Sequence, residues 1–166
     1  MMMTIEPVTP DMHGAILALN NIHAEELSLM DAAGMGALLG GAFHARRIGD
    51  LEAFIIALDE HHEGYDSPNY RWFQARLPRF VYIDRIAVSG KARGKGHARR
   101  LYADLMQRAR DAGHRFLVCE VNSEPPNPAS DAFHAAMGFE EMGAAVIHGG
   151  AKTVRYFALR LDRDAG

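Results

Sequence analysis

The sequence predicts an α/β domain built around a mixed sheet. Strand-like and helix-like patterns alternate through the middle of the chain, which favours a sheet with helices packed against it. A chain of 166 residues can bury most of its unfolded surface around one core, so we expect a single domain over residues 1–166. The composition, 48% hydrophobic and 23% charged, is that of a globular protein.

The first third of the chain reads as a strand, two helices and a hairpin. Apolar residues recur at helical spacing from about Pro10 to Leu27, and Asp31 is suited to cap a second helix. Gly49 and Asp50 suit the tight turn of a hairpin. The expected strands lie at about residues 5–9, 42–48 and 51–58.

The remaining two thirds begin with a long connection, residues 59–79, of the kind that is often functional. An amphipathic helix is expected over about 98–109, with Gly113 as its stop, and another begins at Asn127 and Pro128 and ends at Gly138. The expected strands are Phe80–Val88, the apolar run Arg115–Val121, and a closing hairpin of residues 144–148 and 153–161.

Charge and composition exclude several classes of function. The net charge of −3 gives no general attraction to nucleic acid, and no run approaches the ~18 apolar residues that a membrane helix needs. The single cysteine, Cys119, lies in an apolar run and reads as a buried structural thiol. We therefore expect a cytoplasmic protein, whose start residue is left open by three consecutive methionines.

A glycine-rich turn between a strand and a helix is the most informative stretch. It comprises residues 93–98, Arg-Gly-Lys-Gly-His-Ala. Glycines let backbone N–H groups approach an anion at the positive end of the helix, so the turn is suited to hold a pyrophosphate. Neither a dinucleotide-binding glycine motif nor a P-loop is present. The alternative is a turn that binds nothing.

Two ordered motifs make the resemblance specific. Arg93-x-x-Gly96-x-Ala98 resembles the [Q/R]-x-x-G-x-[G/A] signature of the Gcn5-related N-acetyltransferases (GNAT superfamily). Residues 127–139, Asn-Pro-Ala-Ser-Asp-Ala-Phe-His-Ala-Ala-Met-Gly-Phe, resemble that family's N-x-x-[AS]-x-x-[FL]-Y-x-x-x-G-F segment. The resemblance covers about residues 80–139. It implies a mixed sheet of about six to seven strands with helices on both faces.

The resemblance also implies an activity and a set of site residues. Family members transfer an acetyl group from acetyl-CoA to an amine and need no metal. One strand edge would pair with the pantetheine arm, backbone amides would hold the pyrophosphate, and one helix would line the thiol end. The implied cofactor-binding residues are Ile86, Ala87, Val88, Arg93, Gly94, Lys95, Gly96, His97, Ala98, Arg99, Asn127 and Phe133.

Glu120 is the candidate general base. It ends an apolar strand at the sheet edge where ligands usually bind, and burial would raise its pKa into a useful range. Cys119-Glu120-Val121 also resembles the L-E-V stretch of ribosomal-protein N-terminal acetyltransferases, where the matching glutamate is the proposed base. The alternative is a structural pair with an arginine. Asp84 is a second carboxylate candidate.

His134 is the candidate general acid and departs from the family, which has a tyrosine there to protonate the thiolate. A histidine with a pKa of ~6.5 can protonate a thiolate whose thiol has a pKa of ~8.5. A histidine is shorter than a tyrosine, however, so Tyr156, Tyr82 or water are alternatives. A further alternative is that His134 only packs.

The acceptor, a small-molecule or peptide amine, is not identified by the sequence. Tyr65, Asp66 and Tyr70 are candidate contacts to a cationic amine, whereas Trp72 and Phe73 are expected to pack. His61 and His62 do not have the spacing of metal ligands. The resemblance is compatible with a homodimer. A non-catalytic acyl-CoA-binding module and an interaction domain without ligand are the alternative functions.

Overall fold

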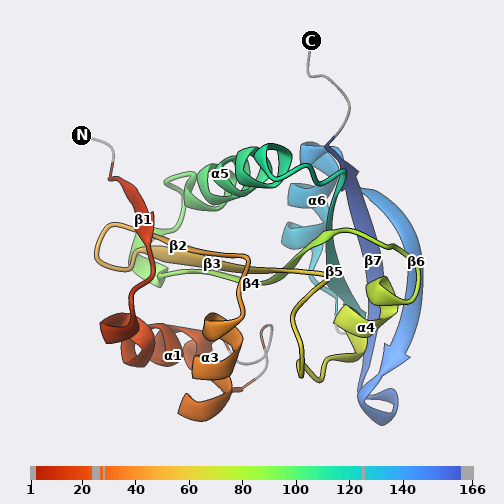
Figure 1. Cartoon of the computed structure of the whole chain (residues 1–166), viewed down its shortest axis with the longest axis horizontal. Coiled ribbons are helices and arrows are strands. Elements are labelled where there is room, and N and C mark those ends of the chain that lie inside the picture. Colours follow the sequence, from red (N-terminus) through yellow and green to blue (C-terminus); the bar gives the residue numbers. More distant parts are fainter. Residues whose placement is uncertain (1–2, 24–26, 28, 125, 162–166) are drawn as a thin grey trace.

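The computed structural model describes residues 3–23, 27, 29–124 and 126–161 (Figure 1). Its strands are β1 (Ile5–Pro7), β2 (His44–Ile48), β3 (Ala53–Asp59), β4 (Val81–Val88), β5 (Phe116–Glu124), β6 (Glu140–Ile147) and β7 (Lys152–Arg160). Its α-helices are α1 (His13–Ile22), α3 (Ala32–Gly40), α4 (Pro68–Gln74), α5 (His97–Asp111) and α6 (Pro128–Met137). Short 3₁₀ turns lie at Pro10–Met12, Gly90–Ala92 and His148–Gly150.

The strands form one sheet of seven in the order β1-β2-β3-β4-β5-β7-β6. Its only parallel pair among the described residues is β4 with β5, and the neighbours on either side pair antiparallel. The predicted mixed α/β sheet is therefore confirmed. A parallel pair needs a crossover connection, and α5 supplies it between β4 and β5.

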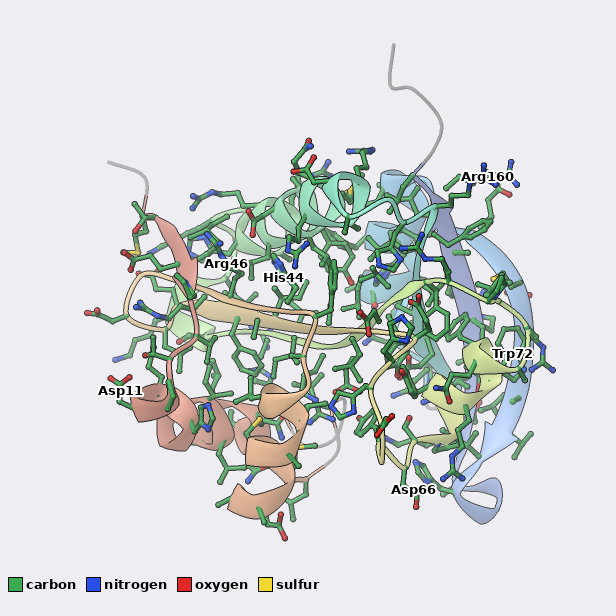
Figure 2. All side chains as sticks on the ribbon, in the orientation of Figure 1. Asp11, His44, Arg46, Asp66, Trp72 and Arg160 are labelled. Atoms are coloured by element: carbon green, nitrogen blue, oxygen red, sulfur yellow. The ribbon has the colours of Figure 1, made fainter. Side chains whose placement is uncertain are left out.

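Helices cover both faces of the sheet, so the central strands are buried on both sides. On β3, Phe54, Ile56 and Leu58 point into a core shared with α1, α3 and α4. The alternate residues of β3, together with Leu101 and Leu105 of α5, belong to a second core on the opposite face. Side chains fill the space between the sheet and its helices in Figure 2. The near-continuous apolar sequence of such a strand follows from this double burial.

Local capping signals begin α3 and both begin and end α6 at the residues that the sequence predicts. The Asp31 carboxylate accepts a hydrogen bond from the Gly34 backbone N–H at 2.7 Å and caps α3. Asn127 caps α6 in the same way, accepting from the Ser130 N–H at 3.3 Å. Gly138 then closes α6 with a φ of 97°, a left-handed conformation that favours glycine.

The structure corrects the sequence prediction in three places. The connection 59–79 contains the helix α4, which is only seven residues long. Ser67 caps this helix, and Pro68 is its first residue. The strand β6 begins at Glu140 instead of residue 144, because an exposed edge strand carries a weak apolar pattern. The helix α1 ends at Ile22, and the expected extension toward Leu27 lies partly outside the described residues.

No helix within the described ranges is both long and apolar enough to cross a membrane.

Replacing Asp31 by alanine tests the cap of α3. The Gly34 N–H loses its acceptor, so we expect the free energy of unfolding to fall by about 1 kcal/mol. Asp31→Asn retains an acceptor oxygen and serves as the control, with a loss of at most a few tenths of a kcal/mol. Urea unfolding of the three proteins measures both values, and equal losses for the two variants would contradict the capping role.

Candidate active site

The site is created where β4 and β5 separate. The structure describes pairing between the two strands at Val81 with Leu117 and at Tyr82 with Val118, and at no later residue of the described chain. Beyond Tyr82 the parallel strands diverge, and a wedge opens inside the sheet. The backbone N–H and C=O groups that face this wedge lack the strand-to-strand bonds that the first two pairs have.

Three adjoining cavities occupy the wedge and its two sides. The wedge cavity, about 120 Å³, lies between β4 and β5 and is lined by Ile83 and Cys119 among others. The helix cavity, about 330 Å³, lies toward α5 and α6 and shares Ile86, Tyr102, Asn127, Ser130 and His134 with the wedge cavity. The loop cavity, about 240 Å³, lies toward α4 and the β6–β7 turn and shares Leu27, Asp84, Arg85, Glu120 and Asn122 with the wedge cavity. The wedge cavity therefore links the other two.

The N-terminus of α5 opens toward solvent beside the helix cavity. Gly94 and Gly96 have φ values of 81° and 78°, so both positions need glycine for their left-handed backbone. An added Cβ at either would meet no atom within 4 Å among the described residues, which leaves the turn accessible. Gly96 is the N-cap of α5 and makes no side-chain cap, so the first-turn N–H groups are available to an anion.

Two residues of the predicted cofactor-binding turn direct their side chains to Glu52. His97 is buried and its Nε2 lies 2.8 Å from a carboxylate oxygen of Glu52, while the Lys95 ammonium lies 3.4 Å from the same oxygen. These contacts fix the turn against the β2–β3 hairpin. Lys95 and His97 thus contribute their backbone to the open turn and use their side chains to hold it, whereas the Arg99 side chain is exposed.

The helix cavity brings together seven of the twelve predicted cofactor-binding residues. They come from the end of β4, from the turn before α5, and from α5 and α6: Ile86, Ala87, Val88, Arg93, Ala98, Asn127 and Phe133. The open edge of β4 and the open end of α5 suit an extended ligand with an amide-bearing arm and phosphates at one end. These residues fit acetyl-CoA.

Glu120 lies in the wedge on β5, where the loop cavity and the wedge cavity meet. Burial raises the pKa of this carboxyl to about 7, opposed by hydrogen bonds from Tyr82 and Asn69. The Tyr82 hydroxyl donates to the carboxylate at 2.8 Å, and the Asn69 amide donates at 3.0 Å. A carboxyl with this pKa is half ionised near neutral pH and can take a proton from an amine.

Asn69 is itself held in place by Tyr156. The Tyr156 hydroxyl donates to the Asn69 oxygen at 2.8 Å, which turns the amide nitrogen toward Glu120. Tyr156 stacks on Trp72, with ring centroids 4.1 Å apart. The predicted packing of Trp72 and Phe73 is confirmed, since Phe73 is fully buried and Trp72 packs against the same core.

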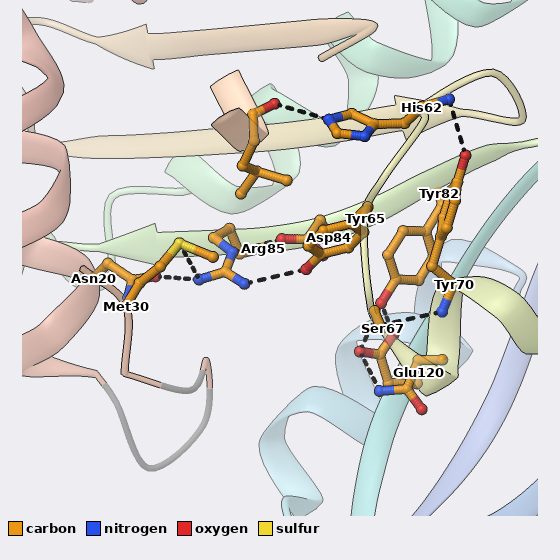
Figure 3. Close-up of polar contacts among 12 residues, drawn as sticks. Asn20, Met30, His62, Tyr65, Ser67, Tyr70, Tyr82, Asp84, Arg85 and Glu120 are labelled. Atoms are coloured by element: carbon orange, nitrogen blue, oxygen red, sulfur yellow. Dashed lines mark hydrogen bonds and ion pairs between the residues drawn. The ribbon is translucent and has the colours of Figure 1, made fainter. Parts of the chain in front are cut away.

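Asp84, the second carboxylate candidate, belongs to a closed network. Its oxygens accept hydrogen bonds from the Tyr65 hydroxyl and from the Arg85 guanidinium. Arg85 also donates to the buried Asn20 of α1 at 2.8 Å, which anchors β4 to that helix (Figure 3). Asp84 is therefore ion-paired with Arg85, whereas Glu120 is hydrogen-bonded only by the neutral groups of Tyr82 and Asn69 among the described residues.

His134 lies on α6, buried between α5 and the wedge. Its Nδ1 is 2.8 Å from the Ser130 carbonyl oxygen, which can only accept, so Nδ1 carries a proton. Its Nε2 is 2.7 Å from the Tyr102 hydroxyl. Burial lowers the pKa of His134, so the ring is neutral. Its Nε2 therefore accepts a hydrogen bond from the Tyr102 hydroxyl.

The candidate acceptor contacts lie in different environments. Tyr65 lines the loop cavity with its hydroxyl committed to Asp84. Asp66, labelled in Figure 2, also lines that cavity. Its exposed carboxylate pairs with Arg71 at 2.9 Å. Tyr70 is 1% exposed and donates to the Asp59 carbonyl, so it packs in the core away from the described cavities.

A group of potential metal ligands lies at the far end of β3. The ligand atoms of Asp59, Glu60 and His114 lie within 4.8 Å of one another. Glu60, however, accepts from the Arg79 guanidinium and from the Phe80 N–H, each at 3.4 Å. The Glu60 carboxylate is thus already hydrogen-bonded by groups of the protein.

The cysteine of the wedge is buried. Cys119 is 3% exposed, and burial raises the pKa of its thiol well above the ordinary value, with the charge of Glu120 adding to the shift. The thiol therefore stays protonated and is a poor nucleophile. This agrees with the prediction of a buried structural cysteine.

A cavity beside an open helix N-terminus, adjoining a buried carboxyl of raised pKa, is suited to bind a phosphate-bearing thioester. The family model described as "Acetyltransferase (GNAT) family" matches residues 24–139. The chain belongs to this acetyltransferase family.

Individual relatives are more distant. The chain is 30% identical over 69 residues to an L-2,4-diaminobutyric acid acetyltransferase of Wolinella succinogenes, and the match spans 42% of this chain and 40% of that protein. Its fold is similar to the ribosomal-protein-S18-alanine N-acetyltransferase of Escherichia coli, with a TM-score of 0.72, 17% identity, and 99% and 97% of the chains covered. It is also similar to Arabidopsis thaliana NAA60 in complex with acetyl-CoA, with a TM-score of 0.73, 14% identity, and 97% and 99% coverage.

Two side chains at the site were not singled out by the sequence. Asn69 was hidden in the long connection, although Ser67 and Pro68 before it signal the helix that carries it. Tyr102 reads as an apolar position of α5, and only the three-dimensional contact with His134 distinguishes it.

Glu120→Gln provides a test of the raised pKa that needs no ligand. A buried carboxyl that titrates at about 7, against 4.5 when unfolded, binds more protons in the native state between these values. It therefore lowers the stability of the native protein as pH rises through that window. We expect the unfolding free energy of Glu120→Gln minus that of the native protein to increase by about 3 kcal/mol from pH ~4.5 to pH ~7.5.

Urea unfolding over this pH range measures the difference. Glu140→Gln, on the exposed edge strand β6, is the matched control and should show a nearly constant difference. A flat difference for Glu120→Gln as well would show that the carboxyl titrates at its ordinary pKa.

Proposed function

We propose that this acetyltransferase acts on a primary amine by direct attack in a ternary complex, with Glu120 as the general base. The single observation that carries the proposal is the position of Glu120. This carboxyl, with a pKa near 7, lies where the wedge cavity meets the loop cavity, beside the cavity that fits acetyl-CoA. The two substrates then approach from opposite sides of one wedge.

The donor side is formed by backbone as much as by side chains. The N–H groups of the first turn of α5 would hold the pyrophosphate, with Arg93 adding charge, and the unpaired edge of β4 beyond Tyr82 would bond the pantetheine amides. Asn127 and Phe133 on α6 would close the cavity. When bound, acetyl-CoA supplies the activated acyl group.

The acceptor side is the loop cavity. Its lining includes the carboxylates of Asp66 and Glu120 and the ring of Tyr65, a combination that suits a cationic amine. Glu120 would remove the proton from the amine before or during attack on the thioester carbon. The Wolinella succinogenes relative is an L-2,4-diaminobutyric acid acetyltransferase, and this similarity supports a small primary amine as the acceptor.

The leaving-group side of the wedge holds His134. Its place in both the wedge cavity and the helix cavity supports a role for this histidine in the departure of the sulfur. The protonated, buried thiol of Cys119 supports direct transfer over an acyl-cysteine intermediate.

Calorimetric titration with acetyl-CoA tests the donor site. We expect saturable binding that Arg93→Glu weakens by roughly tenfold, because a repulsive charge then faces the phosphates. Lys91→Glu makes the same change of charge at an exposed position outside the helix cavity and should bind nearly as well as the native protein. An absence of acetyl-CoA binding by the folded native protein would contradict the proposal.

The pH profile of amine acetylation tests the base. Glu120 must be ionised to accept a proton, so kcat/KM for the amine should rise with pH through a midpoint of about 7. Glu120→Gln should lower kcat/KM by about 10²-fold or more and remove this limb of the profile. Glu140→Gln is the control and should keep the limb. A limb that persists in Glu120→Gln would exclude Glu120 as the base.

A further inference from the structure

Tyr102 occupies the junction between the two cavities that the reaction must join. It is one of five residues that line both the helix cavity and the wedge cavity. Given the proposed function, the donor lies in the helix cavity and the base lies on the wedge, so the thioester group must be near this junction. The side chain of Tyr102 is 1% exposed and held by edge contacts with Phe133 and Phe139 of the opposing segment.

The hydrogen bonding of His134 gives Tyr102 its orientation. Because the His134 Nδ1–H is used on the Ser130 carbonyl, the neutral ring presents only the Nε2 lone pair to Tyr102. His134 in this state has no proton to offer to the cavity. The Tyr102 hydroxyl has one, and rotation about its C–O bond can redirect it without any movement of the ring.

The hydroxyls of the other four tyrosines donate hydrogen bonds to acceptors away from this junction. Tyr82 donates to Glu120 and Tyr156 donates to Asn69, both on the side of the base. Tyr65 donates to Asp84, and Tyr70 donates to a backbone carbonyl in the core. Among tyrosine hydroxyls, only that of Tyr102 lies on the leaving-group side of the wedge. Burial raises the pKa of Tyr102, so the hydroxyl keeps its proton at working pH.

We propose that the Tyr102 hydroxyl is the hydrogen-bond donor to the departing sulfur, and that His134 is a positioning residue that holds this hydroxyl at the junction. In the transfer step the amine nitrogen bonds to the thioester carbon, the carbon–sulfur bond breaks, and the sulfur keeps the electron pair. The amine proton passes to Glu120 and from there to water. The thiolate, stabilised by the Tyr102 hydroxyl, takes a proton from water on release, so the balance is an amide and a thiol.

Tyr102→Phe removes only the hydroxyl. We expect kcat to fall by about 10²-fold, as for the loss of one preorganised donor, with KM for acetyl-CoA changed less than about threefold. Tyr70→Phe is the matched control, because it removes a buried tyrosine hydroxyl from the core, and it should keep kcat within about threefold. Thermal unfolding of both variants reports any loss of folding.

A binding measurement supplies a readout that is independent of turnover. Coenzyme A and desulfo-coenzyme A, in which hydrogen replaces the thiol, are titrated at a pH near the thiol pKa of ~8.5. The native protein should prefer coenzyme A by about tenfold, and Tyr102→Phe should bind the two equally. His134→Phe should weaken the preference and lower kcat, while the double variant should be little worse than Tyr102→Phe, because the two residues act as one unit.

The outcomes separate this inference from the proposed function. If the native protein neither binds acetyl-CoA nor acetylates an amine, the proposed function fails and this inference fails with it. If the native protein is active and Tyr102→Phe keeps both its kcat and its preference for coenzyme A, only the role of Tyr102 is overturned. Loss of activity in His134→Phe but not in Tyr102→Phe would assign the donor role to His134 itself.

Discussion

The separation of β4 from β5 is the constraint on which the site depends. Parallel strands normally pair along their length, yet here pairing is described only at Val81 with Leu117 and at Tyr82 with Val118. A wedge in the interior of a sheet exposes backbone groups that must find other partners. The ion pair of Arg85 with Asp84, together with the hydrogen bond from Arg85 to Asn20, anchors β4 to the helix layer beside the wedge. The preformed gap thereby provides hydrogen-bonding edges for an extended cofactor and a sheltered place for a carboxyl.

The environment of Glu120 balances two opposed effects. Burial disfavours the charged carboxylate, whereas Tyr82 and Asn69 donate hydrogen bonds that favour it. Without the donors, burial would leave an acid that stays protonated, and without burial the carboxylate would be too weak a base for an amine. Holding the pKa near neutrality costs the fold some stability. This is the usual relation between a functional group and the core that contains it.

The sequence could predict the features that depend on neighbours along the chain. The caps Asp31 and Asn127, the glycines of the turn 93–98 and the order of strands and helices are local signals, and the structure contains them. The sequence could not predict contacts between residues that lie far apart along the chain. The contacts of the Lys95 and His97 side chains with Glu52 could not be predicted, because Glu52 lies 43 and 45 residues away. Asn69 and Tyr102 were missed for the same reason, since their roles come from partners 32 to 87 residues away.

One glycine at the rim of the sheet has a bearing on the chemistry at its centre. The indole of Trp72 lies so close over Gly143 of β6 that an added Cβ would come within 2.7 Å of the ring. Trp72 supports Tyr156, and Tyr156 orients the Asn69 amide that donates to Glu120. A methyl group at position 143 would push the Trp72 indole aside. The shift would then reach Tyr156 and, through it, the Asn69 amide. A substitution on the outermost strand would therefore reach, through Trp72 and Tyr156, the hydrogen bond that opposes the raised pKa of Glu120.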